Sequence, residues 1–178
     1  MSTTHSAKVL IDLIAKQNIS NGKIKGTNNF PFLEDLKLSS GTDDGQIDLS
    51  YFETVTGIAA STTTVRDLAG SLSDVEGNTL TFAEVALIAI RNLRTTALAT
   101  LEIGPDATNG FGVLSSGRGF WSDASDRNVV HPNSGWLVLY APDGVPVGAG
   151  STDELAIITS AVSGSTNSWD LLILGRSA

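Results

Sequence analysis

The side chains that most often perform catalysis or bind metals are scarce in this chain. It has 178 residues, no cysteine and two histidines, His5 and His131. A zinc site would need Asp or Glu for most of its ligands, and no His-Glu-x-x-His or comparable spacing is present. His131 lies beside Pro132 in an expected turn, where histidines are more often surface or packing residues than ligands. The histidines therefore predict no metal site.

A serine hydrolase would have to combine His131 with a serine and a carboxylate. No Gly-x-Ser-x-Gly sequence precedes a helical pattern in the chain. Residues 148–151, Gly-Ala-Gly-Ser, lack the lysine of a phosphate-binding loop. We predict that the chain has no catalytic residues and is not an enzyme. A small hydrolase built around His131 is the alternative, which a serine-reactive probe would reveal.

Two pairs of adjacent carboxylates could serve a glycosidase or a calcium ion, namely Asp43 with Asp44 and Asp153 with Glu154. Nothing in the sequence places either pair across a cleft, and adjacent carboxylates in polar turns are usually solvated. The run from Asp43 to Asp48 also lacks the helix–loop–helix calcium pattern. We expect neither a metal ion nor a cofactor.

The glycine-rich loop Gly117-Arg-Gly-Phe-Trp121 carries the candidate contact residues of this chain, Arg118, Phe120 and Trp121. Trp and Arg are enriched in interface hot spots, and aromatic side chains in loops can stack on sugars. In the alternative interpretation, Phe120 and Trp121 close the end of a barrel and make no external contact. Interface contact, glycan contact and packing all remain open for these residues.

The charge balance argues against a nucleic-acid partner. The chain has 19 acidic and 11 basic residues, with a formal net charge of −8, whereas nucleic-acid binding depends on Lys and Arg displacing counterions. No window approaches the ~20 apolar residues of a membrane span, and the N-terminus has no secretory pattern. We expect a chain that is made in a cytoplasm and binds neither nucleic acid nor membrane.

Alternating apolar residues predict several strands. The clearest lie in residues 46–58, 65–68, 136–140, 155–161 and 169–174. Trp136 and Trp169 lie inside these patterns, so we expect both to be at least half buried. Residues 141–144, Ala-Pro-Asp-Gly, predict a turn, and residues 163–167 predict a hairpin loop between the last two strands.

Two segments fit both a strand and a helix. Residues 7–17 have an apolar row at period two, but their charged residues have helical spacing. Residues 79–91 contain helix formers, although the turn and the threonines before them favour a central strand. Residues 18–31 are polar and contain glycine, which predicts an irregular linker.

These elements predict an all-β fold: about eight strands separated by short turns, as in a β-sandwich or jelly roll. We expect a single β-sandwich domain at residues 41–178. Residues 1–40 would form an N-terminal extension, with an arm or first strand followed by the irregular linker. Such an arm could add a strand to the sheet edge of a neighbouring subunit.

Several turn-and-strand sequences resemble a group of small structural proteins of tailed bacteriophages. The resemblance covers roughly residues 45–178, and the sequences that carry it are Asp67-Leu-Ala-Gly-Ser-Leu-Ser-Asp, Gly77-Asn-Thr-Leu-Thr-Phe, Glu102-Ile-Gly, Ala107-Thr-Asn-Gly-Phe, Ser134-Gly-Trp-Leu-Val-Leu-Tyr-Ala-Pro-Asp-Gly, Val147-Gly-Ala-Gly-Ser-Thr-Asp-Glu-Leu-Ala-Ile and Trp169-Asp-Leu-Leu-Ile-Leu-Gly. These patterns are typical of a fold rather than of a catalytic site.

The resemblance implies a β-sandwich virion component without catalytic residues. We expect a head decoration (cement) protein that binds the outside of the capsid, stabilises contacts between capsid subunits and forms a dimer or trimer. Its partners would be the major capsid protein and further copies of itself. The alternative is a tail, baseplate or head-fibre component that binds a glycan on the host surface.

Overall fold

The computed structural model describes residues 6–21, 24–114, 117–162 and 166–178, and for residues 7, 9–21 and 24–35 it describes the backbone alone. The described residues contain strands and no helix, so the predicted all-β class is confirmed. In chain order the strands are β1 (Ala7–Asn21), β2 (Ile24–Ser40), β3 (Gln46–Ile47), β4 (Leu49–Ile58), β5 (Thr63–Asp67), β6 (Leu72–Ser73), β7 (Thr79–Leu80), β8 (Glu84–Asn92), β9 (Leu101–Pro105), β10 (Asn128–Val130), β11 (Trp136–Pro146), β12 (Glu154–Thr159) and β13 (Asn167–Arg176).

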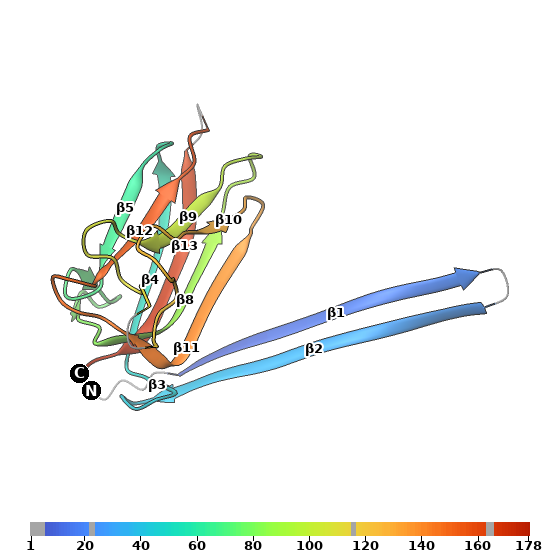
Figure 1. Ribbon diagram of the computed structural model, residues 1–178, viewed down its shortest axis with the longest axis horizontal. Helices are drawn as coiled ribbons and strands as arrows, with labels where there is room; N and C mark the ends of the chain where they lie inside the picture. Colours follow the sequence, from blue (N-terminus) through green and yellow to red (C-terminus); the bar gives the residue numbers. More distant parts are fainter. Residues whose placement is uncertain (1–5, 22–23, 115–116, 163–165) are drawn as a thin grey trace.

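Two antiparallel sheets of four strands each form most of the body of the molecule, which we define as residues 41–178 (Figure 1). One sheet has the strand order β10-β9-β12-β5, and the other has the order β11-β8-β13-β4. The short β6–β7 pair forms a small separate ribbon beside them. Successive strands therefore often lie in different sheets, which brings distant parts of the chain together.

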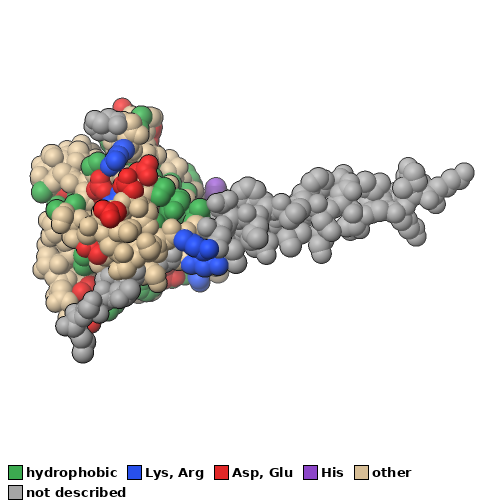
Figure 2. All heavy atoms as spheres, turned by 90° about the horizontal axis from the view of Figure 1, so that it is seen from below, with side chains coloured by type: hydrophobic (Ala, Val, Ile, Leu, Met, Phe, Trp, Pro, Cys, Tyr) green, Lys and Arg blue, Asp and Glu red, His purple; other side chains and the backbone are tan. Residues whose placement is uncertain are grey.

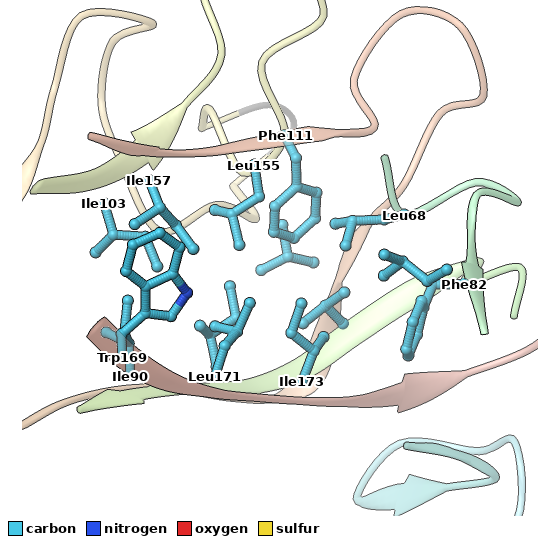
Figure 3. Close-up of a cluster of buried hydrophobic side chains, with 14 of the residues drawn as sticks. Leu68, Phe82, Ile90, Ile103, Phe111, Leu155, Ile157, Trp169, Leu171 and Ile173 are labelled. Carbon is cyan, nitrogen blue, oxygen red and sulfur yellow. The ribbon is translucent and has the colours of Figure 1, made fainter. Parts of the chain in front are cut away.

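A single large apolar cluster joins these two sheets (Figure 3). Strand β13 contributes Trp169, Leu171 and Ile173 at every second position, and the opposite sheet contributes Leu155 and Ile157 of β12. All five side chains are fully buried. Because side chains alternate between the faces of a strand, the residues between them lie on the other face of the sheet.

Strand β8 is buried on both faces. A second apolar cluster contains its Leu87 and Ala89 together with Leu174 of β13, and it is closed by Leu38 and Ile47. Leu38 belongs to the end of β2 and Ile47 to β3, so we call residues 38–47 the hairpin foot. The foot covers part of the outer face of the β11-β8-β13-β4 sheet, which we call the outer face from here on.

Strands β1 and β2 form a long antiparallel hairpin, the hairpin arm, which runs away from the body (Figure 1). Their register pairs every residue from Ala7 with Leu38 to Asn21 with Ile24. The open alternative at residues 7–17 is therefore resolved as a strand. The irregular linker expected at residues 18–31 is wrong for 18–21 and 24–31, which are strand, and residues 22–23 lie outside the described residues. The continuous pairing with β1 gives the backbone hydrogen-bonding partners that the sequence pattern of β2 does not reveal.

Three other local predictions meet the structure differently. Residues 79–91 contain strand rather than helix, as favoured, and β8 is a central strand. Residues 141–144 do not end a strand but form a bulge within β11, between Tyr140 and Val145. The hairpin expected around 163–167 is wrong, because β12 and β13 belong to different sheets; residues 163–165 themselves lie outside the described residues. The turn-forming residues at 141–144 thus form a bulge within a strand, and the segment between β12 and β13 connects two sheets.

Candidate interaction surface

The loop that contains Arg118, Phe120 and Trp121 folds onto itself. The backbone N–H groups of Phe120 and Trp121 donate to the carbonyl oxygen of Gly112, at 2.8 and 3.0 Å. Gly112 has a φ of 83°, and a Cβ at this position would lie 2.7 Å from the ring of Trp121. A glycine is therefore required where the two parts of the loop meet.

The two aromatic residues of this loop pack inward. Trp121 is 5% exposed, and its ring meets that of Phe120 edge-on at 5.8 Å. Phe120 in turn contacts Phe111 of the core at 6.2 Å. Trp121 offers no open ring face for a sugar, so its geometry is that of the packing alternative. Arg118 is the member of the predicted set that reaches the surface.

Arg118 belongs to a chain of ion pairs around Glu84. Its Nη1 lies 2.9 Å from Glu84 Oε1, while Nε of the buried Arg176 lies 2.6 Å from Glu84 Oε2. Arg176 also contacts Asp44 Oδ1 at 3.1 Å and donates to the carbonyl oxygen of Asp43 at 2.7 Å. This network ties the turn of the hairpin foot to β8 and to the last strand. The carboxylate of Asp44 thus serves an ion pair within the chain.

A hollow of about 150 Å³ lies between residues 117–119 and the β11 bulge at 141–145. Gly144 in this bulge has a φ of 74°, and a Cβ there would lie 2.5 Å from Nη2 of Arg176. The bulge therefore packs directly on the ion-pair network. The hollow is small and shallow beside the ligand sites of enzymes, which usually measure about 300–1,000 Å³.

The remaining residues with potential chemistry are dispersed. His131 is exposed, and no group of three or more His, Asp or Glu side chains able to hold a metal ion occurs among the described residues. Asp153 is buried and its Oδ2 accepts from the backbone N–H of Gly150 at 2.5 Å. The pKa of Glu154 is raised, first by desolvation and then by the charges of Asp106 and Asp153. These carboxylates repel one another around a loop.

The outer face carries the apolar residues that sequence reasoning missed. Register places residues of all four strands in three parallel rows across the sheet. The first row, Tyr140, Leu87, Leu174 and Ser50, lies beside the hairpin foot. The second row is Val138, Ala89, Leu172 and Phe52, and the third is Trp136, Arg91, Asp170 and Thr54.

The second and third rows are open to solvent at the edge strands β11 and β4, whereas Ala89 on the central strand β8 is 8% exposed and Leu172 of β13 is partly buried. Trp136 is 60% exposed and Phe52 is 57% exposed, at opposite edges of the sheet. The expectation that Trp136 is at least half buried is therefore wrong, whereas Trp169 is fully buried as predicted. Both tryptophans lie in alternating strands, and only the covering of each face decides between them. Figure 2 shows hydrophobic side chains gathered in part of one face of the body.

Polar groups hold the side chains of the third row in place. The guanidinium carbon of Arg91 lies 5.6 Å from the ring centroid of Trp136, and its Nε lies 3.9 Å from Asp170 Oδ2. The hydroxyl of Thr54 donates to Asp170 Oδ1 at 2.8 Å. A cation over the indole fixes the orientation of an exposed ring. The arrangement presents one ring face, a guanidinium and a carboxylate together.

A groove of about 310 Å³ lies at the Phe52 end of the second row. It is lined by Phe52 and Leu172 of the sheet and by the turn between β6 and β7, which includes the exposed Val75. Asp74 in this turn accepts hydrogen bonds from the backbone and side chain of Asn78, which lower its pKa. The groove thus combines apolar residues of the sheet with the acidic residues of a turn.

Comparisons of this chain with protein-family models, with curated proteins and with solved structures find no match. In the described part of the chain, no helix is long and apolar enough to cross a membrane. Among the described residues, the outer face has the composition of a contact site, with Phe52, Val138 and Trp136 exposed.

Proposed function

We propose that this chain is a structural protein of a tailed-bacteriophage virion, and specifically a head decoration (cement) protein on the outside of the capsid. The observation that carries the proposal is the hairpin arm, which pairs along its whole length and reaches away from a packed body. A protein that stabilises a shell must contact several neighbours at once, and a projecting arm gives a second point of attachment, to the shell or to a neighbouring copy bound on it. No catalytic step forms part of this proposal.

The fold and the sequence patterns support this proposal. We assign the body to the β-sandwich class, with a jelly roll as its closest form, because two four-stranded sheets share one core. The turn and strand sequences at 67–82 and 134–144 are those in which the chain resembles phage structural proteins. A net charge of −8 suits a position outside the shell better than one against packaged DNA. The major capsid protein would be the main partner.

The number of copies per virion tests the proposal directly. Particles purified from a phage that encodes this chain should contain it in proportion to the capsid subunits, and antibody labelling should decorate the heads. A small copy number set by the symmetry of the tail, with labelling at the tail, would replace the head role with the tail role. Particles without the chain would overturn both.

The arm provides a more specific test. A phage whose chain carries Ile11→Lys and Leu13→Lys in β1 should show reduced occupancy on heads, and its heads should break at a lower temperature than wild-type heads. The matched control is Val129→Lys, an exposed valine of β10. Unchanged occupancy in the arm variant would show that the arm does not contribute to binding on the shell, either directly or through a neighbouring copy.

A tail, baseplate or head-fibre role in glycan binding is the second candidate, and the exposed Trp136 favours it. Trp136 is 60% exposed beside Arg91, which in turn faces Asp170, an arrangement on which a sugar ring could stack and form hydrogen bonds. A glycan array should then show binding that Trp136→Ala abolishes and Phe52→Ala preserves. An array without any bound glycan would remove this candidate.

A further inference from the structure

We propose that the hairpin arm of one copy of this chain lies across the outer face of a second copy, over the second and third rows. The inference concerns self-association. It goes beyond the proposed function and holds whether or not the protein decorates a capsid. The occupant is a named segment, strands β1 and β2 of the other copy.

The first argument is that the base of the hairpin already binds this face within one chain. Leu38 of β2 is 4% exposed and packs with Leu87 and Leu174 of the first row. Beyond the first row the covering is incomplete: Ala89 on the central strand is still buried, but Phe52 and Trp136 on the edge strands are largely exposed. The open rows continue an interface that this hairpin makes, so the same kind of ribbon suits them.

The second argument is the composition of the arm. Residues directly opposite in an antiparallel pair share a face of the ribbon, so the pairing of Ala7 with Leu38 defines one face along the whole arm. This face is apolar at almost every position up to the pair of Ala15 with Phe30. Its members are Ala7, Val9, Ile11, Leu13, Ala15, Phe30, Phe32, Glu34, Leu36 and Leu38. The other face is mixed: it contains Lys8, Asp12, Lys16, Asp35 and Lys37 together with Leu10, Ile14, Pro31 and Leu33.

Such a ribbon gains from a partner. An isolated two-stranded hairpin is marginally stable in water and needs a further apolar surface to pack against. The arm runs away from the outer face of its own body (Figure 1). A second copy provides the required surface without any rearrangement of the first.

The third argument is charge. Residues 1–40 contain five Lys and no Arg against three Asp and Glu, a formal charge of +2, whereas residues 41–178 contain six Arg against sixteen Asp and Glu, a formal charge of −10. All lysines of the chain thus lie in the N-terminal segment. Asp170 in the third row and the acidic turn of Asp74 and Glu76 lie at the outer face or beside it. An arm meeting another body is electrostatically favoured, while bodies alone repel one another.

Exchange of two arms would give a closed pair. If each copy places its arm on the outer face of the other, both contacts form at once and the pair has two-fold symmetry. The same contact then forms twice, so that in a dimer each arm packs on an outer face and each outer face is covered by an arm. We therefore expect a dimer rather than an open chain.

Sedimentation velocity over a range of protein concentrations tests this with the full-length chain. The wild type should form a reversible dimer, and the double variant Phe52→Lys with Val138→Lys should raise its dissociation constant at least about tenfold, or about 1.4 kcal/mol. The matched control is Val129→Lys with Val65→Lys on the other sheet. Its residues are 49% and 39% exposed, against 57% for Phe52 and 37% for Val138. A wild type that stays monomeric, or a dimer that both variants weaken equally, would overturn the proposal.

Cross-linking of the unaltered protein gives an independent result. In a mixture of ¹⁵N-labelled and unlabelled chains, a carbodiimide should join arm lysines of one copy to Asp74 or Glu76, beside the outer face of another. Peptide pairs of mixed isotope composition identify these links. Links found only within one copy would mean that the arm folds back onto its own body, and links between arms alone would point to a different dimer. This measurement decides the matter even if a lysine variant fails to fold.

Discussion

The two faces of the β11-β8-β13-β4 sheet use the same four strands and yet reach opposite states. The inner face packs against the second sheet, and its Trp169, Leu171 and Ile173 are fully buried. The outer face has the hairpin foot over its first row and leaves Phe52 and Trp136 open. A sheet face that its own chain closes only in part is a surface suited to a partner.

The same comparison explains the composition of β8. A strand with one solvated face alternates between apolar and polar residues, whereas the middle of β8 has apolar residues on both faces. Leu87 and Ala89, which point to the outer face, pack against the hairpin foot and against residues of the neighbouring strands. The two apolar clusters thus lie on opposite faces of this sheet, and β8 contributes side chains to both.

The two tryptophans of this sheet should show the largest contrast. Trp169→Ala should lower the free energy of unfolding by about 3–5 kcal/mol, because it opens a cavity in the core. No described group accepts a hydrogen bond from Nε1 of Trp169, so this loss is one of packing. Trp136→Ala should cost about 1 kcal/mol or less, since it loses its contact with Arg91 and little burial. Urea unfolding of both variants measures the difference, and equal losses would contradict the assignment of inner and outer faces.

The buried ion pair should matter more than the exposed one. Arg176→Met removes partners from Glu84 and from the carbonyl of Asp43, and it should destabilise the protein by about 3 kcal/mol. Arg91→Met, whose Nε lies 3.9 Å from Asp170 on the outer face, should cost about 1 kcal/mol or less. The same unfolding assay compares them. If Arg176→Met were as mild as Arg91→Met, the network would not connect the foot to the body.

Attachment of the hairpin foot depends on its apolar contact. Leu38→Ala should cost about 2 kcal/mol, because it uncovers Leu87 and Leu174. Leu114→Ala, at a position that is 53% exposed, serves as the matched control and should change stability by about 0.5 kcal/mol or less. Faster amide hydrogen exchange in β8 of the Leu38 variant would locate the effect. Equal stability of the two variants would mean that packing of the foot on the outer face does not stabilise the protein.

Strands that alternate clearly could be predicted from the sequence. Residues 46–58 and 169–174 were recognised because their burial follows their own periodicity. The arm was recognised only in part, because the polar residues 18–31 become regular through pairing with residues that precede them in the chain. The composition of residues 18–31 alone does not indicate this pairing.

The candidate contact residues show the same limit. From the sequence, Trp121 is a candidate for either external contact or packing because it lies in a glycine-rich loop, and Trp136 is expected to be at least half buried because it lies in a strand. Their exposures are 5% and 60%. Which face of a sheet is covered depends on where the other sheet and the hairpin foot lie, and single-strand patterns do not contain this information. An exposed Trp beside an Arg on one row could be found only after the register of β8 and β11 was known.

The inner face also predicts a small pH effect at the edge where β4 meets β5. Tyr51 donates to Glu53 Oε2 at 2.9 Å, and Arg66 of the opposite sheet binds both oxygens of Glu53 at 2.8 Å. Burial, followed by the charge of Glu53, raises the pKa of Tyr51 from 10.0 to about 12. The folded state therefore holds this proton more tightly than the unfolded state does. Its contribution to stability is fully present below pH 10 and is lost as the pH rises toward 12.

Tyr51→Phe should remove that pH dependence, because phenylalanine has no proton to lose. Between pH 10 and 12 the free energy of unfolding of the wild type should fall more steeply than that of the variant. Urea unfolding at a series of pH values gives both slopes, and the difference should be modest because Tyr51 is only partly buried. Parallel slopes would show that folding does not raise the pKa of Tyr51. The edge between the two sheets would then be as solvated as the exposed positions of the outer face.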